Sequence, residues 1–586
     1  MRNTSMTELK PIPSYLKQFI VEQHYDEYTH QDHAVWRYIM RRNVAFLKDY
    51  AHEAYLEGLK KTGITLDRIP NIDEMNQCLA KIGWRAVVVD GFVPPAAFME
   101  FQALKILVIS AEIRNINNIL YTPAPDIIHE AAGHAPIIAN PEYSAYLQKF
   151  GEYGMKAVFS KEDYEIYEAI RYLSIIKEFT GTTQAEIDFA EKDLEEKMNA
   201  VIHASESNLL SRMHWWTVEY GLVGTPNDFK LFGAGLLSSV GESKHCLNDE
   251  VKKIPLDKSC VHFQYDITTM QPQLFVAKDF TDSLQVLEDF ADTMSFRKGG
   301  LTSMELVKET QQVGTLVYSS GLQVSGIISE IITDSNSNPI YFKTSGSTQL
   351  AIDDKELENH GINRYLNGLE SPIGNLSNCN KNIEDFKAED FLQYGIIQNK
   401  AVTLNFESGI MVSGNIELIT KTQLGNILFL EMSPCVVTLG STVLFEHSDS
   451  MYTLALGSKI SSAFSGSADK ENFNVYPPKS ERNALKIHHS DEEKFLFKLY
   501  TMVREMREMK TIQWETVKFV FEKLNHSYPE DWLLRLELLE LLSQYKIEDS
   551  LNIKLNNDLN ELKKKSDTHL NVITAGLNLI YDTVSV

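Results

Sequence analysis

Apolar residues between positions 12 and 296 recur mainly at the spacing of amphipathic helices. In Ala34–Lys60, Asp163–Lys177 and Gln184–Val201 they return every third or fourth position, with charged residues between them. Thr62-Gly63 is a turn signal between helical stretches. Between Cys260 and Ala277 the pattern becomes short and alternating, which predicts one or two strands. The first half of the chain is therefore predicted to be mainly helical.

A different pattern follows the Lys298-Gly299-Gly300 break. Residues 313–465 form short Val-, Ile- and Thr-rich runs bounded by Gly and Ser, which predicts a β-rich domain. Two segments in it resemble each other, Tyr318–Gly326 (YSSGLQVSG) and Phe406–Gly414 (FESGIMVSG). A duplicated hairpin-like unit explains this, and so does convergence of two Gly/Ser-bounded strands. Residues 355–395, between the copies, look mixed and rich in loops.

From His488 to about Ser585 the pattern is helical again, and Trp532–Leu542 is a strongly apolar helix. It is either a core helix, which we favour, or an oligomerisation helix. The patterns together predict a mainly α domain over residues 10–300 with a helical insertion near 160–199. A β-rich domain over 310–470 with a possible duplicated unit follows, and then a C-terminal helical region over 486–586.

Composition narrows the class of protein. The 586 residues suit about three or four domains. The net charge of −24 argues against nucleic acid or an anionic membrane as a partner, because binding phosphates requires clustered Lys and Arg. Five scattered cysteines without a CxxC favour a reducing compartment, and no apolar signal segment or membrane span is recognised. We expect a cytoplasmic protein, with a homo-oligomer as an open possibility.

One segment carries candidate chemistry, Tyr121–Pro136 (YTPAPDIIHEAAGHAP). His129 and His134 are five residues apart, which separates them by about 140° on an ideal α-helix. This spacing excludes the HExxH zinc motif. Both histidines can reach one metal if Gly133 and Pro136 distort or end the helix. Two structural histidines explain the pair equally well.

A metal site would need a third ligand. A carboxylate completes the two-His-one-carboxylate triad, which leaves positions open on Fe(II). Glu219 lies among aromatic and apolar residues in His214–Leu222 (HWWTVEYGL), where a buried carboxylate requires a partner. A core salt bridge would meet the same need.

The segment TPAPDIIHEAAGH resembles the iron motif of the tetrahydropterin-dependent aromatic amino acid hydroxylases. WWTVEYGL is similar to their glutamate segment, and Phe232–Glu242 (FGAGLLSSVGE) to a third family signature. The resemblance covers roughly residues 12–296. It implies a mainly α hydroxylase-like catalytic domain and an enzyme that uses Fe(II), a tetrahydropterin and O2. The interval between His134 and Glu219 is longer than in the family, and His214 replaces a usual tyrosine.

The resemblance also assigns the residues around the metal. His129, His134 and Glu219 are the implied iron ligands. Asp126 and Ser238 are implied to orient these ligands.

The pterin is implied to lie against Gly91, Val93, Phe98 and Glu130. Phe98 would stack on its ring, and the backbone at Gly91 and Val93 would contact its edge. Glu130 would reach the same side of the site, by way of water. An ordinary core aromatic is the other interpretation of Phe98.

The aromatic amino acid substrate is implied to contact Arg114, Thr122, Pro125, Trp215 and Ile267. Arg114 would pair with its carboxylate, since the planar guanidinium binds carboxylates in a bidentate manner. Trp215 resembles the residue that phenylalanine and tyrosine hydroxylases carry at this position. Ile267 lies where tyrosine hydroxylases carry an aspartate. An apolar Ile267 offers no partner to a substrate hydroxyl, so phenylalanine is preferred.

Two alternatives stay open at this point. The first is tyrosine or tryptophan hydroxylation on the same scaffold. The second is a non-catalytic, hydroxylase-like binding protein. Residues 310–586 contain no motif that we can assign, and a structural, oligomerisation or amino-acid-sensing role is a hypothesis only.

Overall fold

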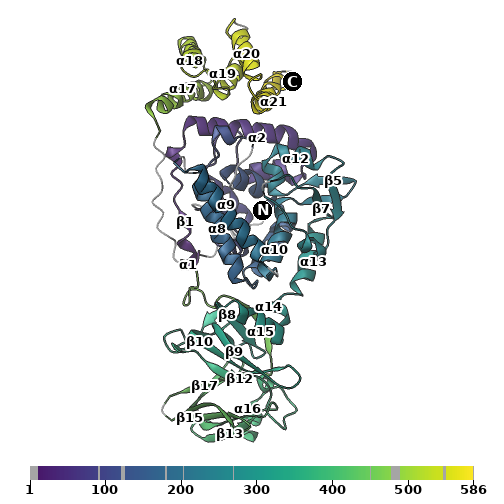
Figure 1. The fold of residues 1–586 in the computed structure, drawn as a ribbon, viewed down its shortest axis with the longest axis vertical. Coiled ribbons are helices and arrows are strands. Elements are labelled where there is room, and N and C mark those ends of the chain that lie inside the picture. Colours follow the sequence, from purple (N-terminus) through teal and green to yellow (C-terminus); the bar gives the residue numbers. More distant parts are fainter. Residues whose placement is uncertain are drawn as a thin grey trace, which may run out of the picture.

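The computed structural model describes residues 11–89, 93–120, 126–178, 181–201, 204–267, 269–448, 450–476, 489–545 and 550–584. Figure 1 shows three parts along the long axis of the molecule. The helical first half occupies the middle, with the strand-rich region at one end and the C-terminal helices at the other. Within the described ranges, no helix has the length and apolar content needed to cross a membrane.

The first half is organised on the long helix α2 (His30–Tyr50), which begins in a capping box between Thr29 and Asp32. The single helix predicted over Ala34–Lys60 is in fact two, α2 and α3 (Ala54–Lys61). Ala51 is extended and bridges to Leu231, and the N–H of His52 donates to the Leu231 carbonyl at 2.8 Å. Pairing with a distant strand therefore ends α2.

Two small sheets were largely missed by the periodicity. One has the order β1-β2-β3 and the other β5-β4-β7-β6. One or two strands were predicted between Cys260 and Ala277, and the described residues of this range form one, β7; residues 258–262 are a 3-10 helix. The strand bounds are β1 Ile20–Val21, β2 Arg85–Val89, β3 Ile106–Ser110, β4 Leu222–Thr225, β5 Asp228–Leu231, β6 Lys252–Pro255 and β7 Gln273–Ala277.

The helices that hold the candidate site pack around these sheets. They are α5 (Pro95–Ala103), η4 (Ile128–His134), α6 (Ala135–Ile138), α7 (Pro141–Gly154), α10 (Glu206–His214), η5 (Trp215–Glu219), α11 (Ala234–Ser238) and α12 (Val240–Cys246). Also present in this half are α1 (Ser14–Lys17), α4 (Ile72–Leu79) and α13 (Phe280–Ala291).

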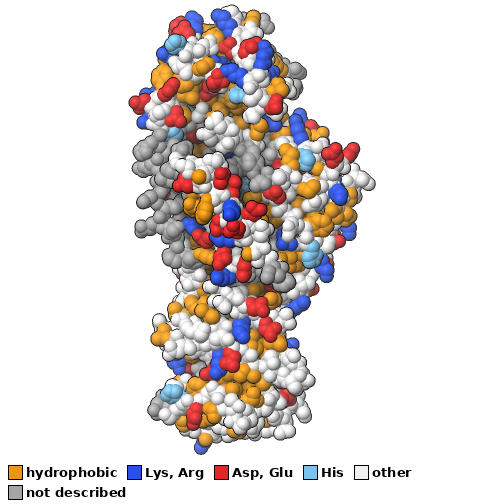
Figure 2. All heavy atoms as spheres, in the orientation of Figure 1, with side chains coloured by type: hydrophobic (Ala, Val, Ile, Leu, Met, Phe, Trp, Pro, Cys, Tyr) orange, Lys and Arg blue, Asp and Glu red, His pale blue; other side chains and the backbone are white. Residues whose placement is uncertain are grey.

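The helical insertion predicted near 160–199 forms a hairpin of α8 (Lys161–Glu178) and α9 (Gln184–Ala200). The two helices pack on each other, and Ala169 and Ala190 are buried. Most other described side chains of α9 are exposed, including Phe189 at 72%. Figure 2 shows acidic side chains gathered over this part of the surface. These features favour the interpretation of the α8–α9 hairpin as an addition to the protein surface.

The strand-rich region contains two antiparallel sheets, as predicted for residues 313–465. The first has the order β11-β10-β9-β8-β18, with β12 beside β10, and the second β13-β14-β15-β16, with β17 beside β15. Two helices before it, α14 (Ser295–Lys298) and α15 (Gly300–Glu309), pack on β18. The strands are β8 Val313–Tyr318, β9 Gln323–Thr333, β10 Pro339–Ile352, β11 Lys355–Glu356, β12 Glu370–Pro372, β13 Ala401–Asn405, β14 Ile410–Lys421, β15 Ile427–Leu439, β16 Thr442–His447, β17 Tyr452–Ala455 and β18 Ile460–Ser465; α16 is Ala388–Gln393.

The two similar segments form matching hairpins, β8–β9 and β13–β14. Gly321 donates its N–H to Tyr318 at 2.9 Å, and Gly409 donates to Phe406 at 3.0 Å. Both glycines have positive φ, 89° and 85°, a conformation that glycine adopts readily. Each hairpin continues into a third antiparallel strand, β10 or β15. The two segments therefore share a hairpin with the same backbone bonding, which both explanations predict.

The C-terminal helices pack against α2. They are α17 (Asp491–Glu508), α18 (Trp514–His526), α19 (Leu533–Gln544), α20 (Ser550–Leu562) and α21 (Asp567–Val584). Leu533–Leu542 of α19 are all buried, so this is a core helix, as favoured from the sequence. Tyr38 of α2 contacts the Trp532 ring and donates to the Val572 carbonyl at 2.8 Å. The first half and the C-terminal helices share one hydrophobic core.

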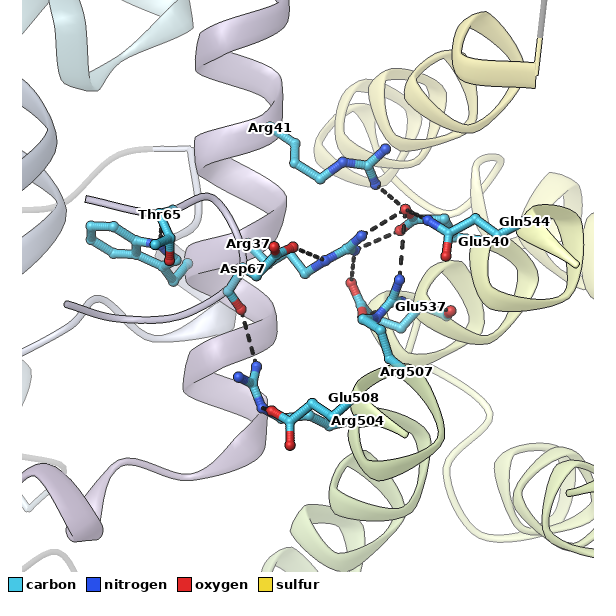
Figure 3. Close-up of polar contacts among 11 residues, drawn as sticks. Arg37, Arg41, Thr65, Asp67, Arg504, Arg507, Glu508, Glu537, Glu540 and Gln544 are labelled. Carbon is cyan, nitrogen blue, oxygen red and sulfur yellow. Dashed lines mark hydrogen bonds and ion pairs between the residues drawn. The ribbon is translucent and has the colours of Figure 1, made fainter. Parts of the chain in front are cut away.

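A buried ion cluster crosses this interface (Figure 3). Arg37 of α2 donates to Glu537 at 2.8 Å and to both oxygens of Glu540 at 2.5 and 2.6 Å. Arg41 reaches Glu540 at 2.6 Å, and Arg507 of α17 reaches Glu537 at 2.8 Å. Burial raises the pKa of Glu537, but Arg37 and Arg507 outweigh it and hold the pKa at about 2.

His33 at the same interface predicts a pH dependence of stability. Burial, followed by the charge of Arg504 on α17, lowers the pKa of His33 to about 3. Its Nδ1 accepts the N–H of Ile69 at 3.2 Å. Because the unfolded chain binds this proton below about pH 6.5, the folded state loses stability as the pH falls from 6.5 toward 3, by at most about 1.4 kcal/mol per pH unit.

The measurement is the midpoint of denaturant unfolding of wild type and His33→Asn between pH 7 and pH 4. Asparagine keeps an acceptor for the Ile69 N–H but does not titrate. We expect the variant midpoint to be lower at pH 7 and to change less with pH. Parallel pH profiles of the two proteins would contradict the assignment.

Candidate active site

The helix that carries the two histidines has π geometry over Ile128–His134, η4. In a π-helix the hydrogen bond runs from residue i to i+5, so residues five apart lie on one face. The Nε2 atoms of His129 and His134 are accordingly 3.3 Å apart. The expected distortion therefore arises from the π turn. Gly133 has a different role, since a Cβ there would lie 2.6 Å from the Ala234 carbonyl oxygen of α11.

Glu219 ends a second π turn, η5 (Trp215–Glu219), in which the Tyr220 N–H donates to the Trp215 carbonyl at 2.9 Å. Its Oε2 lies 3.2 Å from His129 Nε2, and its Oε1 lies 3.3 Å from His134 Nε2. The sequence-predicted trio thus converges on one point, although Glu219 is 85 positions beyond His134.

The trio fits a divalent metal. Neighbouring ligands about 2.1 Å from one ion lie about 3 Å apart, close to the three distances observed. Two imidazoles and one carboxylate are the donor set of non-haem Fe(II) sites. Burial lowers the pKa of His129, but Glu219 outweighs it and raises the pKa to about 9. The Glu219 carboxylate thus favours a positive charge at this position.

Glu130 lies beside the trio, with its Oε2 3.8 Å from His134 Nε2. This oxygen is buried and has no hydrogen-bond partner among the described residues. Burial raises the pKa of Glu130. Buried polar atoms normally have a hydrogen-bond partner, so this oxygen is available to a molecule bound beside the metal site.

Ser238 and Asp126 contact His129 from two sides. The Ser238 Oγ, at the end of α11, is 3.1 Å from His129 Nδ1 and donates to the Ala234 carbonyl at 2.8 Å. Asp126 Oδ1 accepts the backbone N–H of His129 at 3.1 Å. A hydrogen bond to the second nitrogen fixes the tautomer and orientation of a ligating histidine.

Arg114 is buried and pairs with Asp126. Its Nε and Nη2 donate to the carboxylate at 2.7 and 2.9 Å, and its backbone N–H donates at 3.0 Å. Burial raises the pKa of Asp126, but Arg114 outweighs it and the pKa is lowered. No bond from Nη1 is found among the described residues. The implied anchor for the substrate thus rests on the carboxylate that also orients His129.

The structure describes some of the residues that the family resemblance assigns to pterin binding. Phe98 on α5 is half-buried, and its ring centre lies 6.0 Å from that of His214 in an edge-to-face contact. His214 Nδ1 lies 3.7 Å from Glu219 Oε1, so Phe98 is close to the donor set. Val93 is half-buried just before α5. Gly91 lies outside the described residues.

The implied substrate side centres on Trp215. Its ring stacks on Tyr265 at 4.3 Å and 10°, and its Nε1 donates to Gln271 at 3.3 Å. Ile267, two residues beyond Tyr265, is 49% exposed. Thr122 and Pro125 lie outside the described residues.

Two contributors were not predicted from the sequence. Tyr265 stacks on Trp215, and the Tyr220 ring makes a tilted contact with Trp215 at 4.7 Å. Gln102 contacts His214 at 3.2 Å. Gln102 follows Phe98 by one helical turn on α5, a spacing that places both on one face. The sequence carries no comparable signal for Tyr265.

The chain is similar to proteins named phenylalanine hydroxylase. The chain is 29% identical over 265 residues to phenylalanine-4-hydroxylase of Chromobacterium violaceum, covering 45% of this chain and 74% of that one. It is 29% identical over 272 residues to the enzyme of that name from Pseudomonas aeruginosa, covering 45% and 84%. A solved Chromobacterium violaceum phenylalanine hydroxylase, with bound iron(III) and 7,8-dihydrobiopterin, aligns at 26% identity and a TM-score of 0.38, covering 47% and 86%.

The family model for the biopterin-dependent aromatic amino acid hydroxylases matches residues 21–185 and 175–329. The two matches meet at the connection between α8 and α9, where the insertion lies. Together they span more than half of the sequence, and the chain belongs to the biopterin-dependent aromatic amino acid hydroxylases.

Proposed function

We propose that this chain is an iron(II)- and tetrahydropterin-dependent monooxygenase that converts L-phenylalanine to L-tyrosine. The observation that carries the proposal is the convergence of His129, His134 and Glu219 within 3.3 Å of one another. The relatives named phenylalanine-4-hydroxylase support phenylalanine as the substrate.

His129, His134 and Glu219 would hold Fe(II) by one face, and Ser238 and Asp126 would keep His129 in place. When bound, iron would activate O2 and the reduced pterin would supply two electrons, so that one oxygen atom of O2 enters the substrate and the other is reduced. Glu130 would face the pterin with its unpaired Oε2, and Phe98 would contact the pterin ring. The contribution of the polypeptide is position and electrostatics.

Arg114 would bind the carboxylate of the amino acid through Nη1, because Nε and Nη2 are engaged by Asp126. Asp126 would then link the substrate anchor to His129. Thr122 and Pro125 would complete the pocket with Trp215 and Ile267. The Trp215 ring stacks on Tyr265, which fixes its orientation. Trp215 would therefore form a rigid wall for the aromatic ring of the substrate.

The same proposal assigns the parts of the chain. Residues 10–300 would be the catalytic domain, 310–470 a β-rich domain with a possible duplicated unit, and 486–586 a helical region docked on α2. All five cysteines are free, which supports a reducing, cytoplasmic location. The partner is a small amino acid, without nucleic acid or membrane, and a homo-oligomer stays a prediction.

The test is aerobic turnover with Fe(II), a tetrahydropterin and each aromatic amino acid, with products separated by chromatography. We expect tyrosine from phenylalanine, and a kcat/KM for phenylalanine at least about 10-fold above that for tyrosine, since the unpaired hydroxyl of tyrosine is costly to bury. Hydroxylation of tyrosine or tryptophan instead would overturn the substrate assignment. No product from any of the three, despite bound iron, would favour a binding protein.

A further inference from the structure

His214 is a buried side chain that the roles above do not use. It is 8% exposed and ends α10, directly before the π turn that carries Glu219. The rings of Phe98 and Phe150 meet it edge to face at 6.0 and 5.2 Å. Its two nitrogens face different groups. Nε2 lies 3.2 Å from Gln102 Nε2, and Nδ1 lies 3.7 Å from Glu219 Oε1.

The neutral imidazole of His214 carries one proton, on either Nδ1 or Nε2, and the groups beside the two nitrogens determine which. If the Gln102 amide donates to Nε2, the proton is on Nδ1 and points toward Glu219. If the amide is rotated, its oxygen accepts from Nε2, and a bare Nδ1 lone pair faces the carboxylate. One end of the buried amide lacks a partner in either case, as Gln102 Oε1 does here. The choice therefore depends on Glu219, and an N–H toward an anion is favoured over a lone pair.

We infer that Gln102 and His214 form a positioning pair that presents an N–H to Oε1 of Glu219. Oε1 is also the oxygen that approaches His134 Nε2 at 3.3 Å, so this N–H keeps the Glu219 carboxylate oriented between the two histidines. The inference rests on the proposed metal site and adds a residue that shapes it. A tyrosine at this position, the usual family residue, would contact Glu219 through a hydroxyl on a longer ring, so this chain uses a different donor.

The test is binding of Co(II) to the purified full-length chain, followed by absorption and by competition with a chelator, without turnover. His214→Asn keeps an N–H donor at the place of Nδ1, whereas His214→Phe keeps the ring but removes the donor. We expect His214→Phe to weaken Co(II) binding by about 10-fold or more and to change the Co(II) absorption spectrum. His214→Asn should stay within about 3-fold of wild type, which is well inside the loss expected for the donor-free variant.

Gln102→Met gives a second measurement, in case His214→Phe does not fold. It removes the amide that sets the tautomer, and we expect an intermediate loss of Co(II) affinity. Wild-type affinity and spectrum in both His214→Phe and Gln102→Met would overturn the inference. So would a loss in His214→Asn that equals the loss in His214→Phe, because ring packing alone would then be at work. Failure of the wild-type chain to bind Co(II) would instead count against the metal site itself.

Discussion

We expect replacement of Glu219 with alanine to abolish iron binding and tyrosine formation together. Glu219 is the only carboxylate among the described residues that lies within 3.3 Å of both His129 and His134 Nε2. Hydrogen-bond partners outside the ligand set of a metal are worth 10–100-fold in affinity, so loss of a direct ligand should cost more than about 100-fold. The measurements are iron content after reconstitution and product formed from phenylalanine.

Glu250→Ala is the matched control, since Glu250 is exposed and lies outside the site. We expect it to keep the iron content and turnover of wild type. Normal iron content with lost turnover in Glu219→Ala would contradict the role of Glu219 as a ligand and would assign it to a later step. Normal values of both would remove it from the site.

The identity of the metal-site residues could be read from the sequence, but their geometry could not. His129 and His134 stand out as a pair, whereas apolar periodicity says nothing about a π turn, which is a change in backbone hydrogen bonding. Gly133 appears in the sequence as a helix breaker. Glycine is required at this position because a Cβ would lie 2.6 Å from the Ala234 carbonyl oxygen, a contact that only the tertiary structure creates.

The short strands of the first half show a second limit. Arg85–Val89 and Ile106–Ser110 each contain four consecutive apolar residues, a pattern that alone does not separate a strand from a buried helix. They pair in parallel, which the intervening helix α5 makes possible. The strand-rich region was predicted better because its strands are longer and its glycine turns recur.

The ion cluster shows a third limit. Glu537 and Glu540 are conspicuous in an apolar helix, and buried carboxylates require partners. The sequence therefore indicates that partners exist. Arg37 is 500 positions away from Glu537, so only the folded chain identifies it.

Neutralising Glu540 should release the C-terminal helices from α2. Glu540 contacts Arg37 through both oxygens, Arg41 at 2.6 Å and Arg507 at 3.7 Å. Glu540→Gln keeps the shape but leaves three arginines with one buried carboxylate, Glu537. Removing one partner of a buried ion pair costs about 3–5 kcal/mol, mostly from the uncompensated charge. We expect a lower thermal midpoint and faster proteolysis within residues 489–584.

Two further variants separate charge from packing at this interface. Glu74→Gln removes an exposed partner of Arg68 and should cost no more than about 1 kcal/mol, because water screens that pair. Adding Arg41→Met to Glu540→Gln removes a cation whose partner is lost, and should recover part of the stability. The control is the stability of Arg41→Met alone. If Arg41→Met destabilises Glu540→Gln as much as it destabilises wild type, the two side chains act independently. Charge balance then does not hold the C-terminal helices in place.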